Sequence, residues 1–121
     1  MRSFLVLGSI LWALTLAGCG GPMGQALHHY QDTRYPEALH ALEDLEEDAQ
    51  DFEPAERARY TLYRGLAHLA VGNAPAASRW LARTRGELAE DPERLSQVDK
   101  SRLESGWRSL GLMPGDAVIT D

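Results

Sequence analysis

Beyond residue 22, apolar residues recur every three or four positions, which is the spacing of one face of an α-helix. No segment alternates apolar and polar residues for long enough to predict a half-buried strand, and glycine and proline fall mostly between the periodic segments. The pattern therefore predicts an all-α fold. We expect five helices, over residues 23–33, 36–49, 54–72, 75–90 and 95–111.

The helical segments also repeat one another. The second and fourth helices coincide at an offset of 39 residues, and they share a proline at the helix start, then an alanine, then a leucine: Pro36 and Pro75, Ala38 and Ala77, Leu42 and Leu81. The other three helices share a small residue at which a neighbouring helix can approach closely, namely Ala26, Gly65 and Gly106. Two kinds of helix, A and B, thus alternate in the order A-B-A-B-A.

This order resembles tetratricopeptide-repeat (TPR) proteins, which have a small residue in helix A, a turn such as Gly72-Asn73, and an alanine early in helix B. The resemblance covers about residues 23–112 and implies two and a half repeats of antiparallel helical hairpins, with residues 95–111 as a C-terminal capping helix. The chain departs from the family because its offsets are 39 and 41, where a TPR repeats every 34 residues or so, and because the aromatic residue at the start of helix A is missing. A Sel1-like repeat and a plain helical bundle are the alternatives.

The N-terminus carries a different pattern. Residues 4–17 are an apolar run of 14 residues behind Arg2, too short to cross a bilayer, which takes about 20 residues, and typical of a secretory signal peptide. The run ends in Leu16-Ala17-Gly18-Cys19, which resembles the lipobox of bacterial lipoproteins, in which the cysteine is lipidated and becomes the first residue after cleavage.

The lipobox resemblance implies a leader over residues 1–18, a lipidated Cys19 with a short tether over 19–22, and a domain held at the membrane in the cell envelope. Gly20 stands where an aspartate would retain such a protein in the inner membrane, so the resemblance implies the periplasmic face of the outer membrane in a diderm bacterium. The alternatives are an ordinary signal peptide with an incidental cysteine, or an uncleaved anchor.

Composition narrows the functional classes. The 121 residues suffice for one small domain, over 23–112, with a tail over 113–121. The net charge of −6 argues against a general nucleic-acid binder, and the single cysteine excludes an internal disulfide and a multi-cysteine zinc site. The chain carries no hydrolase, metalloprotease, Walker or dinucleotide-binding motif, and His28 and His29 are adjacent on a helix, where they point in different directions. We therefore expect no enzymatic activity, no cofactor and no metal.

Charge is unevenly distributed, with eight acidic residues and no basic one over Glu43–Glu56, and six arginines and no acidic residue over Arg57–Arg85. One interpretation is ion pairing between neighbouring hairpins, and the other is an arginine-lined groove for an acidic or C-terminal peptide segment. The TPR resemblance implies a partner-binding face built from A helices: Leu27, Gln31, Arg59, Tyr63, Leu66, Lys100, Glu104 and Trp107. For Leu66 and Trp107, a place in the core explains the pattern equally well.

Together these patterns predict a membrane-anchored envelope lipoprotein that acts as a protein–protein interaction adaptor or assembly helper, with Arg59, Tyr63, Leu66, Lys100 and Trp107 as partner-binding residues. The expected partner is another envelope protein or a peptide segment of one, and a homo-oligomer is a further expectation because two and a half repeats make a small stack. The alternative is a small-ligand-binding or cell-wall-processing accessory protein. An open groove favours the adaptor, and an enclosed pocket between the helices favours the alternative.

Overall fold

The computed structural model describes residues 21–111, and these form helices joined by short turns. The elements are α2 (Gly24–Gln31), α3 (Tyr35–Asp44), α4 (Glu46–Ala49), α5 (Pro54–Ala70), α6 (Ala74–Glu90), the 3₁₀ helix η1 (Pro92–Arg94) and α7 (Gln97–Ser109). The expected leader (1–18), Cys19 and the tail (113–121) lie outside the described residues. Within this part of the chain, no helix is both long and apolar enough to cross a membrane.

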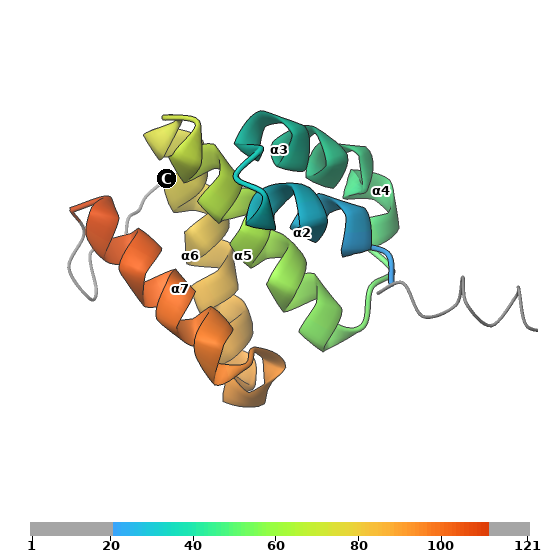
Figure 1. Ribbon diagram of the computed structural model, residues 1–121. Helices are drawn as coiled ribbons and strands as arrows, with labels where there is room; N and C mark the ends of the chain where they lie inside the picture. Colours follow the sequence, from blue (N-terminus) through green and yellow to red (C-terminus); the bar gives the residue numbers. More distant parts are fainter. Residues whose placement is uncertain (1–20, 112–121) are drawn as a thin grey trace, which may run out of the picture.

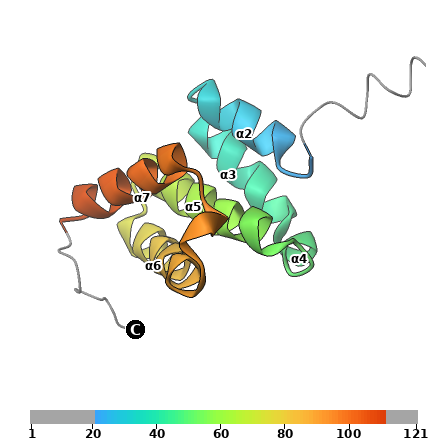
Figure 2. The same ribbon diagram turned by 90° about the horizontal axis from the view of Figure 1, so that it is seen from below.

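Helix α5 lies at the centre of the domain. The hairpin of α2 and α3 packs on one side of it, and α6 and α7 pack on the other (Figures 1 and 2). The closest pairings are α5 with α6 and α2 with α3, each joined by a tight turn. The sequence prediction of an all-α domain made of packed helical hairpins is confirmed.

The two hairpin turns each contain one residue in the left-handed region and close with the equivalent hydrogen bond. Gly72, between α5 and α6, has a φ of 88°, and Thr33, between α2 and α3, has a φ of 59°. The amide after each of these residues closes the turn, donating from Asn73 to the His68 carbonyl and from Arg34 to the His29 carbonyl, both at 2.9 Å. The turns are therefore equivalent at the 39-residue offset, although only the turn between α5 and α6 has the glycine that a left-handed conformation favours.

Local sequence accounts for where the helices begin. Pro36, Pro54 and Pro75 each lie in the first turn of a helix, where the missing amide leaves no hydrogen bond unmade. Asn73 caps α6 by accepting from the Ala76 amide at 3.2 Å, and Ser96 caps α7 by accepting from the Asp99 amide at 3.2 Å.

The expected helix over 36–49 is wrong in one respect, because it is broken at Leu45 into α3 and α4. An unbroken helix would place Glu43 and Glu47 one turn apart, as like charges, and would crowd further acids at the C-terminal end of the helix dipole. The break instead puts three acids in the first turn of α4, where the dipole favours negative charge.

Two glycines allow the helices to pack closely around one leucine. Leu81 of α6 is fully buried, and a Cβ added to Gly65 of α5 would lie 2.7 Å from its Cδ2. A Cβ added to Gly106 of α7 would lie 2.9 Å from Leu66 and 3.3 Å from Leu81. The expectation that Gly65 and Gly106 sit at close helix contacts is confirmed.

Helix α7 closes the end of the helical array. It buries Leu103 and Trp107 against the core and exposes Arg102, Glu104 and Arg108. The equivalent B-helix positions are also buried at both ends of the domain, since Ala38, Ala77, Leu42 and Leu81 are each fully excluded from solvent. The core is thus continuous from α2 to α7, and α7 covers its last apolar surface.

Candidate functional site

Three of the five predicted partner-binding residues lie in the core. Tyr63, Leu66 and Trp107 are only 4%, 6% and 4% exposed, and they pack with the other buried side chains. Arg59 and Lys100 are half-buried at the surface. The remaining residues assigned to this face differ among themselves: Leu27 is half-buried, and Gln31 and Glu104 are exposed.

The Tyr63 hydroxyl joins α5 to α7. It donates to Asp99 Oδ1 at 2.6 Å and accepts from the Arg102 guanidinium, while Arg59 Nε lies 3.7 Å from Asp99 Oδ2. Burial, and then the hydrogen bond to Asp99, raise the pKa of Tyr63 to about 12, so the phenol is neutral at physiological pH. The Tyr63 ring packs edge-on against Tyr30 of α2 at 5.2 Å. The polar atoms of these side chains contact one another, and together they link α2, α5 and α7; we call this cluster the Tyr63 joint.

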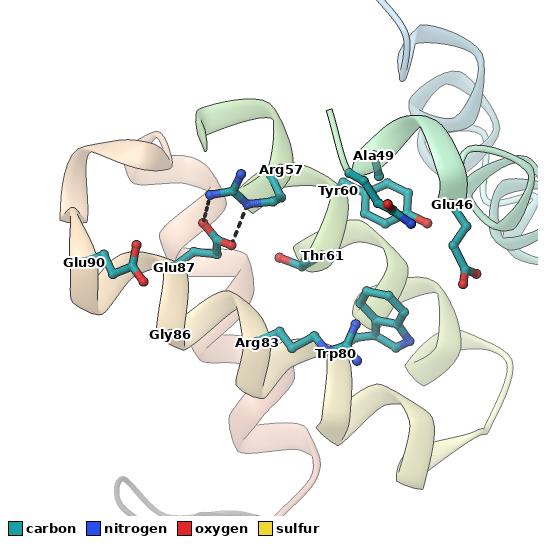
Figure 3. Close-up of a pocket in the computed structure, with 11 residues that line it drawn as sticks. Glu46, Ala49, Arg57, Tyr60, Thr61, Trp80, Arg83, Gly86, Glu87 and Glu90 are labelled. Carbon is teal, nitrogen blue, oxygen red and sulfur yellow. Dashed lines mark hydrogen bonds and ion pairs between the residues drawn. The ribbon is translucent and has the colours of Figure 1, made fainter. Parts of the chain in front are cut away.

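A pocket of about 510 Å³ opens elsewhere, between α4, α5 and α6. It is open to solvent, and Figure 3 shows the side chains that line it. Its lining combines two aromatic rings, two arginines, three acids, small residues and two polar uncharged side chains: Tyr60, Trp80, Arg57, Arg83, Glu46, Glu87, Glu90, Ala49, Gly86, Gln50 and Thr61. None of the five predicted partner-binding residues lies in this lining.

At one end of the pocket, two guanidinium groups lie over the Trp80 ring. The Cζ atoms of Arg64 and Arg83 are 4.3 and 4.4 Å from the ring centroid, and the Tyr60 ring meets Trp80 edge-on at 5.9 Å. Arg64 is buried, and its NH1 donates to Tyr60 Oη at 2.8 Å and to Glu46 Oε1 at 3.0 Å. This arrangement fixes the orientation of the indole while leaving it half-exposed to the pocket.

Contacts outside the pocket fix the position of Tyr60. Its hydroxyl donates to the Leu42 carbonyl at 2.9 Å, and its ring packs edge-on against Phe52. Burial raises the pKa of Tyr60, which keeps the phenol a neutral donor in spite of the nearby Arg64 charge. The aromatic end of the pocket is therefore rigidly supported.

The other end of the pocket holds an ion-pair network. Arg57 of α5 contacts Glu87 of α6 in a two-pronged pair, with Nε–Oε2 at 2.9 Å and NH2–Oε1 at 3.3 Å (Figure 3). Arg94 of η1 also donates to Glu87 Oε1 at 2.6 Å and lies 3.2 Å from Glu90. Burial opposes ionisation of Glu87, but the two arginines outweigh it and lower the pKa of this carboxyl.

The expected pairing of acids with arginines across the hairpins is only partly observed. Arg64 of α5 does pair with Glu46 of α4, whereas Glu56, which lies 3.8 Å from Arg59, belongs to the same helix as Arg59. Arg57 instead pairs with Glu87, outside the acidic segment. His40 lies 3.4 Å from Asp44, one turn further along α3, at the exposed surface. Among residues 21–111, no group of three or more histidine, cysteine, aspartate or glutamate side chains is arranged to hold a metal ion.

Sequence reasoning missed the α6 side of the pocket. Trp80, Arg83 and Glu87 recur at intervals of three and four residues, so they form one stripe on the helix, and Gly86 interrupts the helical pattern beside them. The sequence signal that could have predicted this wall of the pocket was a polar helix stripe that contains an aromatic residue and charges, with a glycine beside it. The chain matches no protein-family model, no curated protein and no solved structure.

Proposed function

We propose that this chain is a lipid-anchored envelope protein whose TPR-like helical domain holds a segment of another envelope protein. The observation that supports the proposal is the open pocket between α4, α5 and α6. In it, the partly exposed Trp80 ring is fixed in orientation by contacts with Arg64 and Arg83. Aromatic and arginine side chains in a supported, concave surface are the groups that dominate the energy of protein interfaces.

The repeat supports the TPR-like part of the proposal. The two hairpin turns have equivalent hydrogen bonds, and the alanine and leucine that recur in the B helices are fully buried in both hairpins. Helical-hairpin repeats present continuous surfaces on both sides of the stack, and such surfaces commonly hold extended peptides or helices.

The anchor is proposed from Leu16-Ala17-Gly18-Cys19, outside the described residues. Cells fed a fatty acid that carries an alkyne should label the wild-type protein, and Cys19→Ser should abolish the label and release the protein from the membrane fraction. A wild-type protein that takes up no label, with the variant fractionating identically, contradicts the anchor.

One observation favours the alternative function. The pocket volume of about 510 Å³ falls in the range of roughly 300–1,000 Å³ that is usual for small-molecule sites. A small ligand of the cell wall is therefore the second candidate occupant. The two candidates differ in what a reactive group placed at the pocket would capture.

The test is site-specific photo-cross-linking in intact cells. A photo-reactive residue replaces Gln50 at the pocket, Lys100 beside the Tyr63 joint, Gln25 on α2 or Ser105 on α7, all at least partly exposed. The proposal predicts one recurrent protein adduct from Gln50 and none from Gln25 and Ser105. The absence of a protein adduct at all four positions contradicts the adaptor function, and a small-molecule mass increase at Gln50 alone supports the alternative.

A further inference from the structure

Gly86 lies inside helix α6 without a structural reason to be glycine. A Cβ added there would have no heavy atom within 4 Å, and its φ is not in the left-handed region. Glycine inside a helix costs about 0.5–1 kcal/mol relative to alanine. The chain therefore accepts this loss at a position where packing and backbone conformation both permit a side chain.

The other two glycines in the middle of helices, Gly65 of α5 and Gly106 of α7, provide the contrast. An added Cβ would clash with Leu81 at Gly65 and with Leu66 at Gly106, so both are required by packing. Gly86 alone among the three faces the pocket. Its effect on the structure is to leave room on the α6 wall, between the Arg57–Glu87 pair and Arg83 (Figure 3).

The charges around this space identify what it can take. Each of the three acids in the lining already has an arginine partner: Glu46 with Arg64, Glu87 with Arg57, and Glu90 with Arg94. Arg83 is exposed and lies over the Trp80 ring, and among the described residues no carboxylate lies within 4.0 Å of it. Among the described charges that line the pocket, the one without an oppositely charged partner is thus the Arg83 guanidinium, which is suited to bind a carboxylate through two hydrogen bonds.

We infer that the pocket takes a peptide segment in which a large apolar side chain lies next to an acidic residue. The apolar side chain fills the space beside Gly86, and the acidic side chain pairs with Arg83 next to the Trp80 ring. This inference rests on the proposed adaptor function and adds the chemistry of the partner segment. A basic side chain in the same place would lie beside Arg83 as a like charge, so the pocket discriminates against it.

The test selects peptides from a random 12-residue display library on the full chain, extracted from the envelope in detergent. The enriched peptides should share a large apolar residue adjacent to aspartate or glutamate. Replacing that acid with its amide should weaken binding at least tenfold. Arg83→Glu should cause a similar loss, and Arg108→Glu, an exposed arginine on α7, should cause none.

The decisive variant is Gly86→Leu, which fills the space and also improves the intrinsic helix propensity of α6. It should abolish peptide binding while its melting temperature stays at or above that of the wild type. Ser105→Leu, which adds the same side chain to the exposed face of α7, should bind as the wild type does.

The inference is overturned if no peptide is enriched, if the enriched peptides are basic, or if Gly86→Leu binds them unchanged. These failures are distinguishable from failure of the adaptor function. A recurrent protein adduct at Lys100 and none at Gln50 would preserve an adaptor that uses the A-helix face, and would exclude the pocket as its site.

Discussion

The glycines of α5 and α6 allow a paired test of the packing, because the same substitution has opposite expected effects at the two positions. Gly86→Ala adds a methyl group with no atom within 4 Å, so it should raise the free energy of unfolding by about 0.5–1 kcal/mol through helix propensity alone. Gly65→Ala gains the same propensity, but it must also accommodate its methyl group against α6.

The cost at Gly65 follows from its neighbours. The added Cβ would lie 2.7 Å from Leu81 Cδ2, 2.8 Å from Leu81 Cγ and 3.1 Å from the Leu81 backbone nitrogen. Leu81 is fully buried and also lies against Gly106, so it cannot move aside without disturbing α7. Overpacking of this kind costs about 1–3 kcal/mol, so Gly65→Ala should be less stable than Gly86→Ala by about that amount.

Urea unfolding followed by far-UV circular dichroism measures the difference. The midpoints should separate while the dependence on urea concentration stays equal, which shows that the change lies in stability and not in the extent of unfolding. Equal midpoints for the two variants, or a higher midpoint for Gly65→Ala, would show that the contact between Gly65 and Leu81 does not limit the packing of α5 on α6.

Three further substitutions test other parts of the structure. Thr33→Gly should raise the free energy of unfolding by about 0.5–1 kcal/mol, because it removes a β-branched side chain from a left-handed position, and Gly72→Ala at the equivalent turn should lower it. Thermal unfolding measures both changes, and a lower melting temperature for Thr33→Gly would contradict backbone strain at Thr33. Tyr63→Phe should lower the free energy of unfolding by about 1–3 kcal/mol, because it removes the hydroxyl that contacts both Arg102 and buried Asp99. Tyr35→Phe should change the free energy of unfolding little, and equal urea midpoints for the two variants would contradict the role of the Tyr63 joint. Burial and the Arg64 charge lower the pKa of His68 in the folded protein, whereas His68 of the unfolded chain keeps its usual pKa of 6.5. The unfolded chain therefore binds more protons, and the free energy of unfolding should fall as the pH drops from 6.5 through the lower pKa of the folded state. His68→Gln should remove this part of the pH dependence, and an unchanged pH profile would refute the assignment to His68.

Much of the fold follows from local chemistry that can be read from the sequence. Helix starts are marked by Pro36, Pro54 and Pro75, and the turn after α5 is marked by Gly72. The equivalent turn at Thr33 carries no such signal, because a β-branched residue rarely adopts a positive φ and the surrounding hairpin imposes it. Tertiary packing therefore determined a turn that residue preferences could not.

The candidate site was harder to predict for a related reason. The apolar period runs through Leu45 without interruption, so the break between α3 and α4 has no apolar signature. That break brings Glu46, Ala49 and Gln50 to the wall of the pocket opposite α6. The pocket thus depends on an irregularity that periodicity does not reveal.

The A-helix face shows the converse problem. The spacing of Arg59 and Tyr63 correctly places them one turn apart on α5, but spacing does not tell whether that stripe meets solvent or another helix. Helix α7 packs there, so Tyr63 is buried against Asp99 and only Arg59 stays partly accessible. Binding through Arg59 and Lys100 stays a prediction that the cross-linking positions will test.

The most direct test of the pocket as the partner-binding site is an NMR titration of the isotope-labelled full chain with the partner segment recovered by cross-linking. Trp80 and Trp107 provide two separate indole signals, because Trp80 lines the pocket from α6 and Trp107 of α7 is 4% exposed in the core. If the partner binds in the pocket, the signals of the Trp80 indole and of the amides around Gln50 and Gly86 should shift, while those of Trp107 and Lys100 should not. Shifts confined to Arg59, Lys100 and the neighbouring residues of α7, with Trp80 unchanged, would contradict binding in the pocket.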